Sequence, residues 1–481
     1  MKPLELSSRA GRPAPHKLRR FARSKGLVIA VAVVSVTWWL SPASVNALSS
    51  FARQTGLSCD TCHWSFPELK PTGREFKLNG YTLTAEKNLT ATGTAKTAEL
   101  SLPQFVPLSA SLLTSLTYTR LSKPGAQDPS VEVPQGLNIW LAGQILPNFG
   151  EAVQITYTAA DDHFSFDSSD VRYVFQTTLF GEDLVLGIDS NNNPTFEDVW
   201  NSVPAWGFPF ASADSAGFAP AVTTLIDGPL AIQVVGGGLY ALFADHLYVL
   251  AEVYRSQHLG QAQPETGVPS PPAYQPINIQ YVAPYWRVAW QQEVGKNNYF
   301  EIGTYGIYVS STPNSTGGAT DSYLDLAADL TYELTLGNGD VISVHSTFIY
   351  ETSDLDASSA LAPAQSNPGI HTLETWRLDA NYHFGNKFTF TAGPFLTWGT
   401  SDSFLYPAVS ASGDTTANNI NNSPADFGYI AQAAFWPGQN FQIALQYRGF
   451  ITYNGTSSNY DGNGRNASDN NTINAFIWIN Y

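Results

Sequence analysis

The chain has 481 residues, of which 43% are hydrophobic and only 13% are charged, and its formal net charge is −16 at pH 7. This acidic balance argues against nucleic acid as a partner, because an acidic surface repels phosphate. The two cysteines and the one histidine beside them are too few for the four ligands of a structural zinc site. The sequence shows no identifiable nucleotide-binding, protease or hydrolase motif.

The first 47 residues have the three parts of a secretory signal peptide. A basic stretch between Lys17 and Lys25 precedes an apolar run over residues 27–40, and small residues follow up to Ala47. We expect cleavage after Ala47; the alternative is a retained membrane anchor, for which the run is short. Because the leader holds eight Lys/Arg and one Glu, cleavage leaves 16 basic and 39 acidic residues, a net charge of about −23.

Cys59, Cys62 and His63 form the sequence C-D-T-C-H, and these two cysteines are the only ones in the chain. The C-x-x-C-H spacing is the attachment site of a c-type haem. Each thiol can form a thioether with a haem vinyl group, and the adjacent imidazole can be the axial ligand of the iron. The alternatives are a disulfide or a redox-active cysteine pair, but no βαβ pattern follows His63, as a thioredoxin-like site requires. We therefore expect one covalently attached haem c.

The sequence around this motif carries a resemblance. Residues 51–81 contain F-A-R-Q-T-G before the motif, F-P-E-L after it, and then G-R-E-F-K-L-N-G-Y. This block resembles the N-terminus of the fused monohaem c-type cytochrome–porin family of the outer membrane, which includes outer-membrane Fe(II) oxidases. The resemblance implies a haem-binding segment over residues 48–103, followed by a membrane β-barrel over residues 104–481.

Other residues of the segment are candidates for the haem environment. Cations pair well with the carboxylates of haem propionates, although they can equally be solvated surface charges. The candidate propionate partners are Arg53, Arg74 and Lys77. Aromatic side chains can enclose an apolar macrocycle, or pack within the segment or against the barrel wall. The candidates are Phe51, Trp64, Phe66, Phe76 and Tyr81.

The sixth ligand of the iron is not evident from the sequence. The only methionine, Met1, leaves with the leader, so a haem with methionine and histidine ligands is not expected. The other histidines of the mature chain are more typical of ordinary polar residues than of ligands. They are His163, His246, His258, His345, His371 and His383. A site open to water or a gas is the remaining possibility.

Residues 104–481 have the pattern of a transmembrane barrel. Segments of about ten residues alternate apolar with polar, as membrane strands do when one face meets lipid and the other a polar lumen. The clearest segments are 323–334, 376–384 and 441–451. Charges repeated this regularly must face the lumen, because they are costly in lipid. A soluble propeller is the alternative, but no repeat has a blade period.

Turn and loop signals alternate along this region. The predicted short turns are 147–152, 181–183, 244–246, 295–297, 337–339, 385–387 and 437–439. The predicted long loops are 122–134, 161–169, 190–228, 257–280, 311–321, 353–370, 400–424 and 454–470. Seven turns and eight loops connect about sixteen strands, an even number with both ends in the periplasm.

Two further features support this topology. The chain ends in the apolar strand pattern N-A-F-I-W-I-N-Y, which resembles the assembly signal of outer-membrane barrels. Loop 190–228 is the longest and is rich in aromatic residues, including Trp200 and Trp206, which argues against disorder. By analogy with general porins, this third long loop is expected to fold into the lumen or to pack over the rim.

These patterns predict an all-β outer-membrane barrel with a small cytochrome segment plugging its lumen. The predicted function is an electron conduit between an extracellular donor, Fe(II), and a periplasmic cytochrome or other electron carrier, with Fe(II):cytochrome c oxidoreductase activity as the possible reaction. Lumen carboxylates would attract the cation, or are an ordinary polar pore lining; they are Asp325, Asp329, Glu333 and Asp379. No catalytic acid or base is required for electron transfer.

Three alternatives remain open from the sequence. The chain can be a diffusion porin with a haem-bearing periplasmic appendage, a conduit that carries electrons outward to extracellular acceptors, or a sensor of a gaseous haem ligand. All three place the barrel in the outer membrane of a Gram-negative bacterium.

Overall fold

The structure, a computed structural model, describes residues 48–85, 87–92, 99–159, 162–212, 222–257, 277–313, 318–361, 367–409 and 415–481. All of them belong to one compact unit, Val45–Tyr481. The predicted signal peptide, residues 1–47, lies outside the described residues, as does His258.

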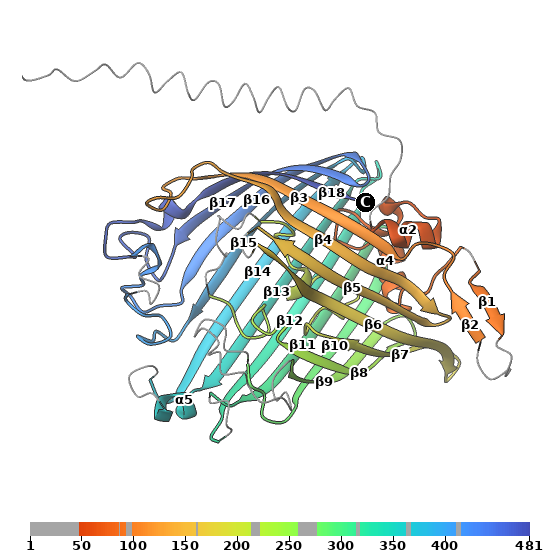
Figure 1. The fold of residues 1–481 in the computed structure, drawn as a ribbon, viewed down its shortest axis with the longest axis horizontal. Coiled ribbons are helices and arrows are strands. Elements are labelled where there is room, and N and C mark those ends of the chain that lie inside the picture. Colours follow the sequence, from red (N-terminus) through yellow and green to blue (C-terminus); the bar gives the residue numbers. More distant parts are fainter. Residues whose placement is uncertain are drawn as a thin grey trace, which may run out of the picture. The chain divides into compact units, whose positions relative to one another are not determined.

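Sixteen antiparallel strands form a closed barrel, in which β18 pairs with β3 to complete the ring (Figure 1). The strands are β3 (Leu108–Thr119), β4 (Ser130–Leu146), β5 (Phe149–Thr158), β6 (His163–Leu179), β7 (Glu182–Asn191), β8 (Val234–Phe243), β9 (Leu247–Ser256), β10 (Ala283–Val294), β11 (Asn298–Ser311), β12 (Asp321–Thr335), β13 (Val341–Asp354), β14 (Ile370–Phe384), β15 (Phe388–Gly399), β16 (Asp426–Gly438), β17 (Phe441–Thr452) and β18 (Thr472–Asn480). Closure leaves the ring without a free edge. The predicted barrel of about sixteen strands is confirmed.

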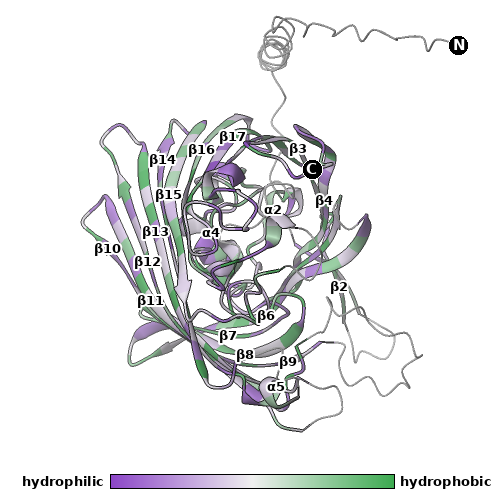
Figure 2. Cartoon of the chain, turned by 90° about the vertical axis from the view of Figure 1, so that its left-hand side faces the viewer, coloured by the Kyte–Doolittle hydropathy of each residue, from purple (hydrophilic) through white to green (hydrophobic). Residues whose placement is uncertain are grey.

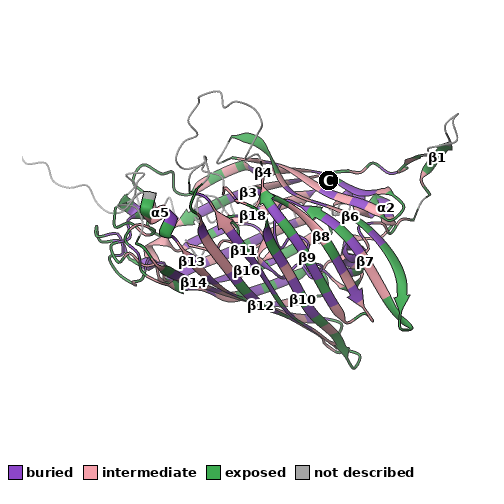
Figure 3. Cartoon of the chain, turned by 90° about the horizontal axis from the view of Figure 1, so that it is seen from below, coloured by how far each residue is buried: buried purple, intermediate pink, exposed green. Residues whose placement is uncertain are grey.

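Alternation along the strands separates an inner polar face from an outer apolar face. Figure 3 shows buried and more exposed residues alternating along the strands. On β12, Asp325, Asp329 and Glu333 are buried toward the lumen, whereas Leu326 and Leu330 are exposed on the outside. The same holds on β14 and β17, whose inward residues are buried and whose outward residues are partly or fully exposed. A two-residue side-chain period on a closed sheet produces this separation, as the sequence predicts.

Short turns connect the strands at one end and longer loops connect them at the other. The seven predicted short turns are all present, but the predicted long loop 161–169 is wrong. Strand β6 begins at His163 and pairs with Thr158 of β5, so only residues 159–162 connect the two strands. Polar residues extend this hairpin because ladder hydrogen bonds join backbone groups, whatever the side chains are.

Several small elements are not part of the ring of strands. A two-stranded hairpin, β1 (Leu89–Thr92) and β2 (Glu99–Leu102), precedes the barrel and was not expected from the sequence. The loops carry the helix α5 (Asp356–Leu361) and the 3-10 helices η1 (Pro204–Trp206), η4 (Thr415–Ala417) and η5 (Ala467–Asn470). None of the helices within the described residues is long and apolar enough to cross a membrane.

The N-terminal segment, residues 48–85, contains the helices α2 (Ser49–Thr55), α3 (Cys59–Cys62) and α4 (Pro71–Leu78). Gly56 ends α2 with a φ of 68°, a left-handed conformation that favours glycine, and Pro71 begins α4, where its missing N–H is not needed. Figure 2 shows α2 and α4 inside the ring of strands.

Candidate cofactor site

The C-D-T-C-H motif is held at the short-turn end of the barrel. Cys59 and Cys62 begin and end the single turn of α3, and the Cys59 N–H donates to Oε1 of Gln439, in the turn after β16, at 3.0 Å. The two cysteines do not form a disulfide bond. Gly73 allows α4 to approach this turn closely, because a Cβ atom there would lie 2.4 Å from the Cys62 carbonyl oxygen.

His63 follows α3 directly and is partly buried. Burial lowers the pKa of His63 to about 4, although the carbonyls of Pro67 and Glu68 oppose this shift. The ring is therefore neutral at neutral pH, which is the form that binds a metal. Its Nδ1 atom is buried and has no hydrogen-bond partner.

A cavity adjoins Cys59, Cys62 and His63. The segment contributes mainly apolar side chains, among them Leu48, Phe51, Leu57, Phe66, Leu69, Phe76 and Tyr81. Four of the five predicted aromatic residues thus line the cavity, whereas Trp64 does not. A neutral imidazole, two thiols and an apolar cavity in one place fit a covalently attached haem.

The far wall of the cavity comes from parts of the chain that are distant in sequence. Trp140 of β4 and Ala152 of β5 belong to the barrel wall, and Phe196, Asn201 and Trp206 belong to a long loop. Sequence reasoning did not assign these residues to the cofactor. The aromatic content of the loop was the available signal, but the pairing that brings Trp140 to the same place is long-range.

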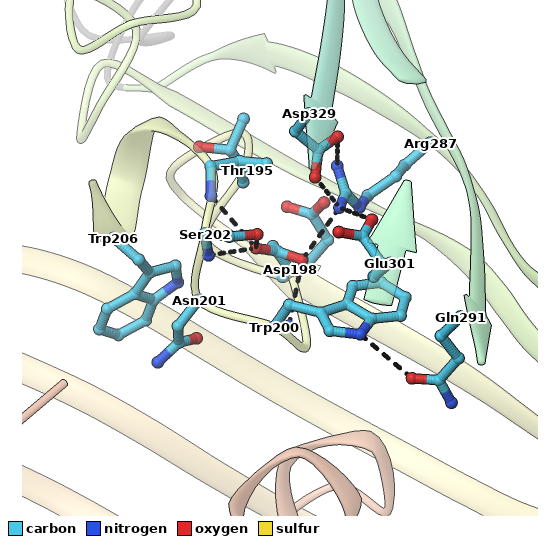
Figure 4. Close-up of polar contacts among 12 residues, drawn as sticks. Thr195, Asp198, Trp200, Asn201, Ser202, Trp206, Arg287, Gln291, Glu301 and Asp329 are labelled. Carbon is cyan, nitrogen blue, oxygen red and sulfur yellow. Dashed lines mark hydrogen bonds and ion pairs between the residues drawn. The ribbon is translucent and has the colours of Figure 1, made fainter. Parts of the chain in front are cut away.

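The loop after β7, described over residues 192–212 and 222–233 and here called the inner loop, folds into the lumen, which is one of the two positions expected for the third long loop. Asp198 accepts hydrogen bonds from the N–H groups of Trp200, Ser202 and Val203, which closes a compact turn (Figure 4). The same carboxylate lies 3.4 Å from the guanidinium of Arg287 on β10. The inner loop is therefore held against the part of the barrel wall that contains β10.

Lys77 joins the N-terminal segment to the inner loop. Its ammonium donates to the carbonyls of Phe196 and Asp198 and to Oδ1 of Asn201, at 2.7–2.8 Å. Burial, and after it the neighbouring Arg172, lower the pKa of Lys77 to about 7. Lys77 lines the cavity, but these three acceptors already use its three donors.

The other two predicted propionate partners have different roles. Arg74 forms a buried ion pair with Glu333 of β12, in which Nη1 lies 2.5 Å from Oε1. Arg53 is exposed and donates to the carbonyls of Val106 and Leu108, which lead into the barrel. Neither residue lines the cavity. Both instead hold the N-terminal segment against the barrel.

The other described histidines lie away from the cavity. His345 and His383 on neighbouring strands contact Glu68, and the His246 ring contacts the carbonyl of Gln291. His371 pairs with Asp402 at 2.9 Å near the long loops. His163, the first residue of β6, is exposed. Within the described residues, His63 is the one histidine that lines the cavity.

The four predicted lumen carboxylates all face inward. Asp329 bonds Arg287 at 2.7 Å, Glu333 bonds Arg74, and Asp379 contacts His345 at 2.9 Å. Asp325 accepts the N–H of Ile226 in the inner loop at 2.8 Å. Because basic side chains lie against three of them, their attraction for a cation is weaker than the sequence alone suggests.

Comparisons of the sequence with protein-family models and with curated proteins find no match. Solved structures of similar fold include OmpT of Vibrio cholerae, at 12% identity and a TM-score of 0.40, covering 78% of this chain and 97% of that one. Salmonella typhi OmpF in complex with daunomycin matches at 10% identity and 0.45, covering 78% and 98%. A mutant Rh. blastica porin matches at 12% and 0.37, covering 78% and 99%.

Proposed function

We propose that this chain is an outer-membrane electron-transfer protein, in which a porin-like barrel encloses a monohaem cytochrome segment. The observation that carries the proposal is the convergence of Cys59, Cys62 and His63 on one apolar cavity inside a closed barrel. The resemblance of residues 51–81 to the cytochrome–porin family supports the same function.

The outer surface supports a membrane location. Phe384, Phe388 and Phe435 cluster outside the barrel near the short turns, with 4.8 Å between the ring centroids of the last two. Trp398, ten residues beyond Phe388 on β15, is 40% exposed and packs beside Phe348. Ten strand residues at a tilt of about 40° span roughly 25 Å of height, the thickness of the apolar band of such barrels.

The residues of the site divide the work of holding the cofactor. The Cys59 and Cys62 sulfurs would attach it covalently, and the neutral imidazole of His63 would bind its iron. Aromatic side chains, including Phe76 and Trp206, line the cavity. When bound, the haem supplies a one-electron redox centre.

The position of the site suggests the direction of access. Short turns face the periplasm in outer-membrane barrels, so we place the N-terminal segment and its cavity at the periplasmic end. Electrons then pass between an extracellular donor, for which we propose Fe(II), and a periplasmic electron carrier. The reaction that follows is oxidation of Fe(II) with reduction of that carrier.

The visible spectrum of the purified protein tests the proposal. We expect haem that survives denaturation, is lost in the Cys59→Ala/Cys62→Ala variant, and is reduced by Fe(II) at the growth pH of the organism. If dithionite reduces the haem but Fe(II) does not, Fe(II) is the wrong donor, and outward transfer to an external acceptor becomes the better account. Protein that carries no covalent haem contradicts the proposal.

A diffusion porin is the second candidate, because an open cavity remains between α4 and the barrel wall. Asp245, His246 and Gln291 line it together with Arg74 of the N-terminal segment. Conductance in planar bilayers distinguishes the two functions. A diffusion porin gives steady open-channel currents, whereas a barrel filled by the segment and the inner loop gives little current.

A further inference from the structure

A tight turn of the N-terminal segment holds His63. His63 and Leu69 form an antiparallel bridge, and the Trp64 N–H donates to the Glu68 carbonyl at 3.2 Å. The Glu68 carbonyl also lies close to the His63 ring. The backbone at residue 68 is therefore connected by hydrogen bonds to the turn that carries the His63 imidazole.

The Glu68 side chain extends from this turn to the inner face of the barrel wall, and Glu68 is only 2% exposed. Its Oε1 accepts from the Ser343 hydroxyl at 2.5 Å and lies 3.7 Å from Nε2 of His345, and its Oε2 lies 3.2 Å from Nε2 of His383. Burial opposes ionisation, but His383 and His345 outweigh it and lower the pKa of Glu68 to about 2. A buried charge with several partners has few alternative positions.

The partners of Glu68 are themselves held in place. Nδ1 of His345 lies 2.9 Å from Oδ2 of Asp379, and Nδ1 of His383 lies 3.2 Å from the Thr389 hydroxyl. Trp64 stacks on His383, with 5.9 Å between ring centroids. The Glu68 carboxylate therefore contacts side chains that are themselves held by hydrogen bonds across strands β13 to β15.

We propose that Glu68 is a positioning residue, which couples the orientation of the His63 imidazole to the barrel wall. The Glu68 carbonyl accepts a hydrogen bond within the turn that carries His63. The Glu68 carboxylate contacts Ser343, His345 and His383 of the barrel wall. Orientation of a metal-binding histidine by surrounding hydrogen bonds is a common way to set the properties of a metal centre. The effect on the haem rests on the proposed function, whereas the mechanical coupling between turn and wall does not.

Four variants of the full-length holoprotein test the coupling, one of them, His383→Gln, in the barrel wall. Glu68→Gln removes the charge but keeps the shape, and Glu68→Ala removes both. Glu75→Ala is the matched control, because Glu75 is an exposed glutamate of the same segment on α4. The readouts are amide hydrogen exchange of residues 63–70, the electron paramagnetic resonance spectrum of the ferric protein, and its midpoint potential.

We expect Glu68→Ala to accelerate exchange in residues 63–70 at least tenfold and to broaden the resonance spectrum. Glu68→Gln should shift the potential with a smaller change in exchange, and Glu75→Ala should match the wild type in all three readouts. His383→Gln, which changes only the wall, should also accelerate exchange in residues 63–70. If Glu68→Ala does not yield folded protein, the comparison of Glu68→Gln, His383→Gln and Glu75→Ala decides the question.

The inference is overturned if residues 63–70 of Glu68→Ala exchange their amide hydrogens at the wild-type rate. It is also overturned if both of the single variants Glu68→Gln and His383→Gln exchange at that rate. Accelerated exchange with an unchanged resonance spectrum and potential overturns the effect on the iron. The failure of the proposed function is a different result, because a wild-type protein without covalent haem leaves the exchange comparison intact.

Discussion

At the residue scale, Glu197 in the inner loop is a carboxyl group that keeps its proton to a higher pH in the folded state than in the unfolded chain. Burial, and after it the neighbouring Asp198, raise its pKa to about 7, while Tyr285 donates to its Oε1 at 2.8 Å. Between its ordinary pKa and this value, the folded state binds a proton that the unfolded chain has lost. Stability should therefore fall as pH rises through this window.

We predict that the free energy of unfolding falls by up to about 3 kcal/mol between pH 5 and pH 8, and that Glu197→Gln removes this fall. Urea unfolding in detergent, followed by tryptophan fluorescence at both pH values, measures it. A Glu197→Gln variant as pH-dependent as the wild type would assign the dependence to other groups.

A second residue-scale prediction concerns the buried pair of Arg74 and Glu333. Glu333→Ala leaves the buried guanidinium without its carboxylate, and this should cost about 3–5 kcal/mol. The Arg120 side chain is 59% exposed and lies 3.9 Å from Asp469, so Arg120→Ala should cost less than about 1 kcal/mol. Equal shifts of the urea midpoint would show that Arg74 does not depend on its partner.

The difference between local and distant signals decides which site residues could be predicted. Cys59, Cys62 and His63 are adjacent in sequence, so their spacing alone indicates their chemistry. Trp140 reaches the same cavity only through the register of β4 with β5, which no local pattern encodes. Arg74 was expected beside a propionate, because the sequence does not show that Glu333 lies opposite it.

At the element scale, the two-residue period of apolar and polar side chains identified the membrane strands, because one face of each strand meets lipid and the other meets a polar lumen. The pattern does not identify strand residues whose two faces meet the same solvent. Residues 163–169 are an example, because their polar side chains indicated a loop although the residues belong to β6. The hairpin β1–β2 was missed for a related reason: four-residue strands are too short for a recognisable period.

The inner loop yields an element-scale prediction. Asp198→Ala removes the acceptor for the N–H groups of Trp200, Ser202 and Val203 and one anionic partner of Arg287. The loop should then become sensitive to protease, and single-channel conductance should rise several-fold. Glu182→Gln, at the exposed start of β7, is the control. Unchanged conductance and protease resistance in Asp198→Ala would mean that other contacts suffice to hold the loop.

At the scale of the whole molecule, the outer apolar band predicts how the barrel tolerates charge. Leu330 lies near the middle of β12 and faces outward, so Leu330→Arg should destabilise the barrel in lipid by about 2–4 kcal/mol. Asn297→Arg, in the exposed turn before β11, should be nearly neutral. Folding titrations in phospholipid vesicles compare them. Equal effects would contradict the membrane position of the band.

The central claim is that the barrel carries electrons across a membrane through the site at Cys59, Cys62 and His63. Vesicles that contain the purified protein and trap a soluble cytochrome c test it directly, with Fe(II) added outside. The account predicts that the trapped cytochrome is reduced rapidly with the wild type and only at the background rate with the Cys59→Ala/Cys62→Ala variant. Equal rates in the two preparations would contradict it.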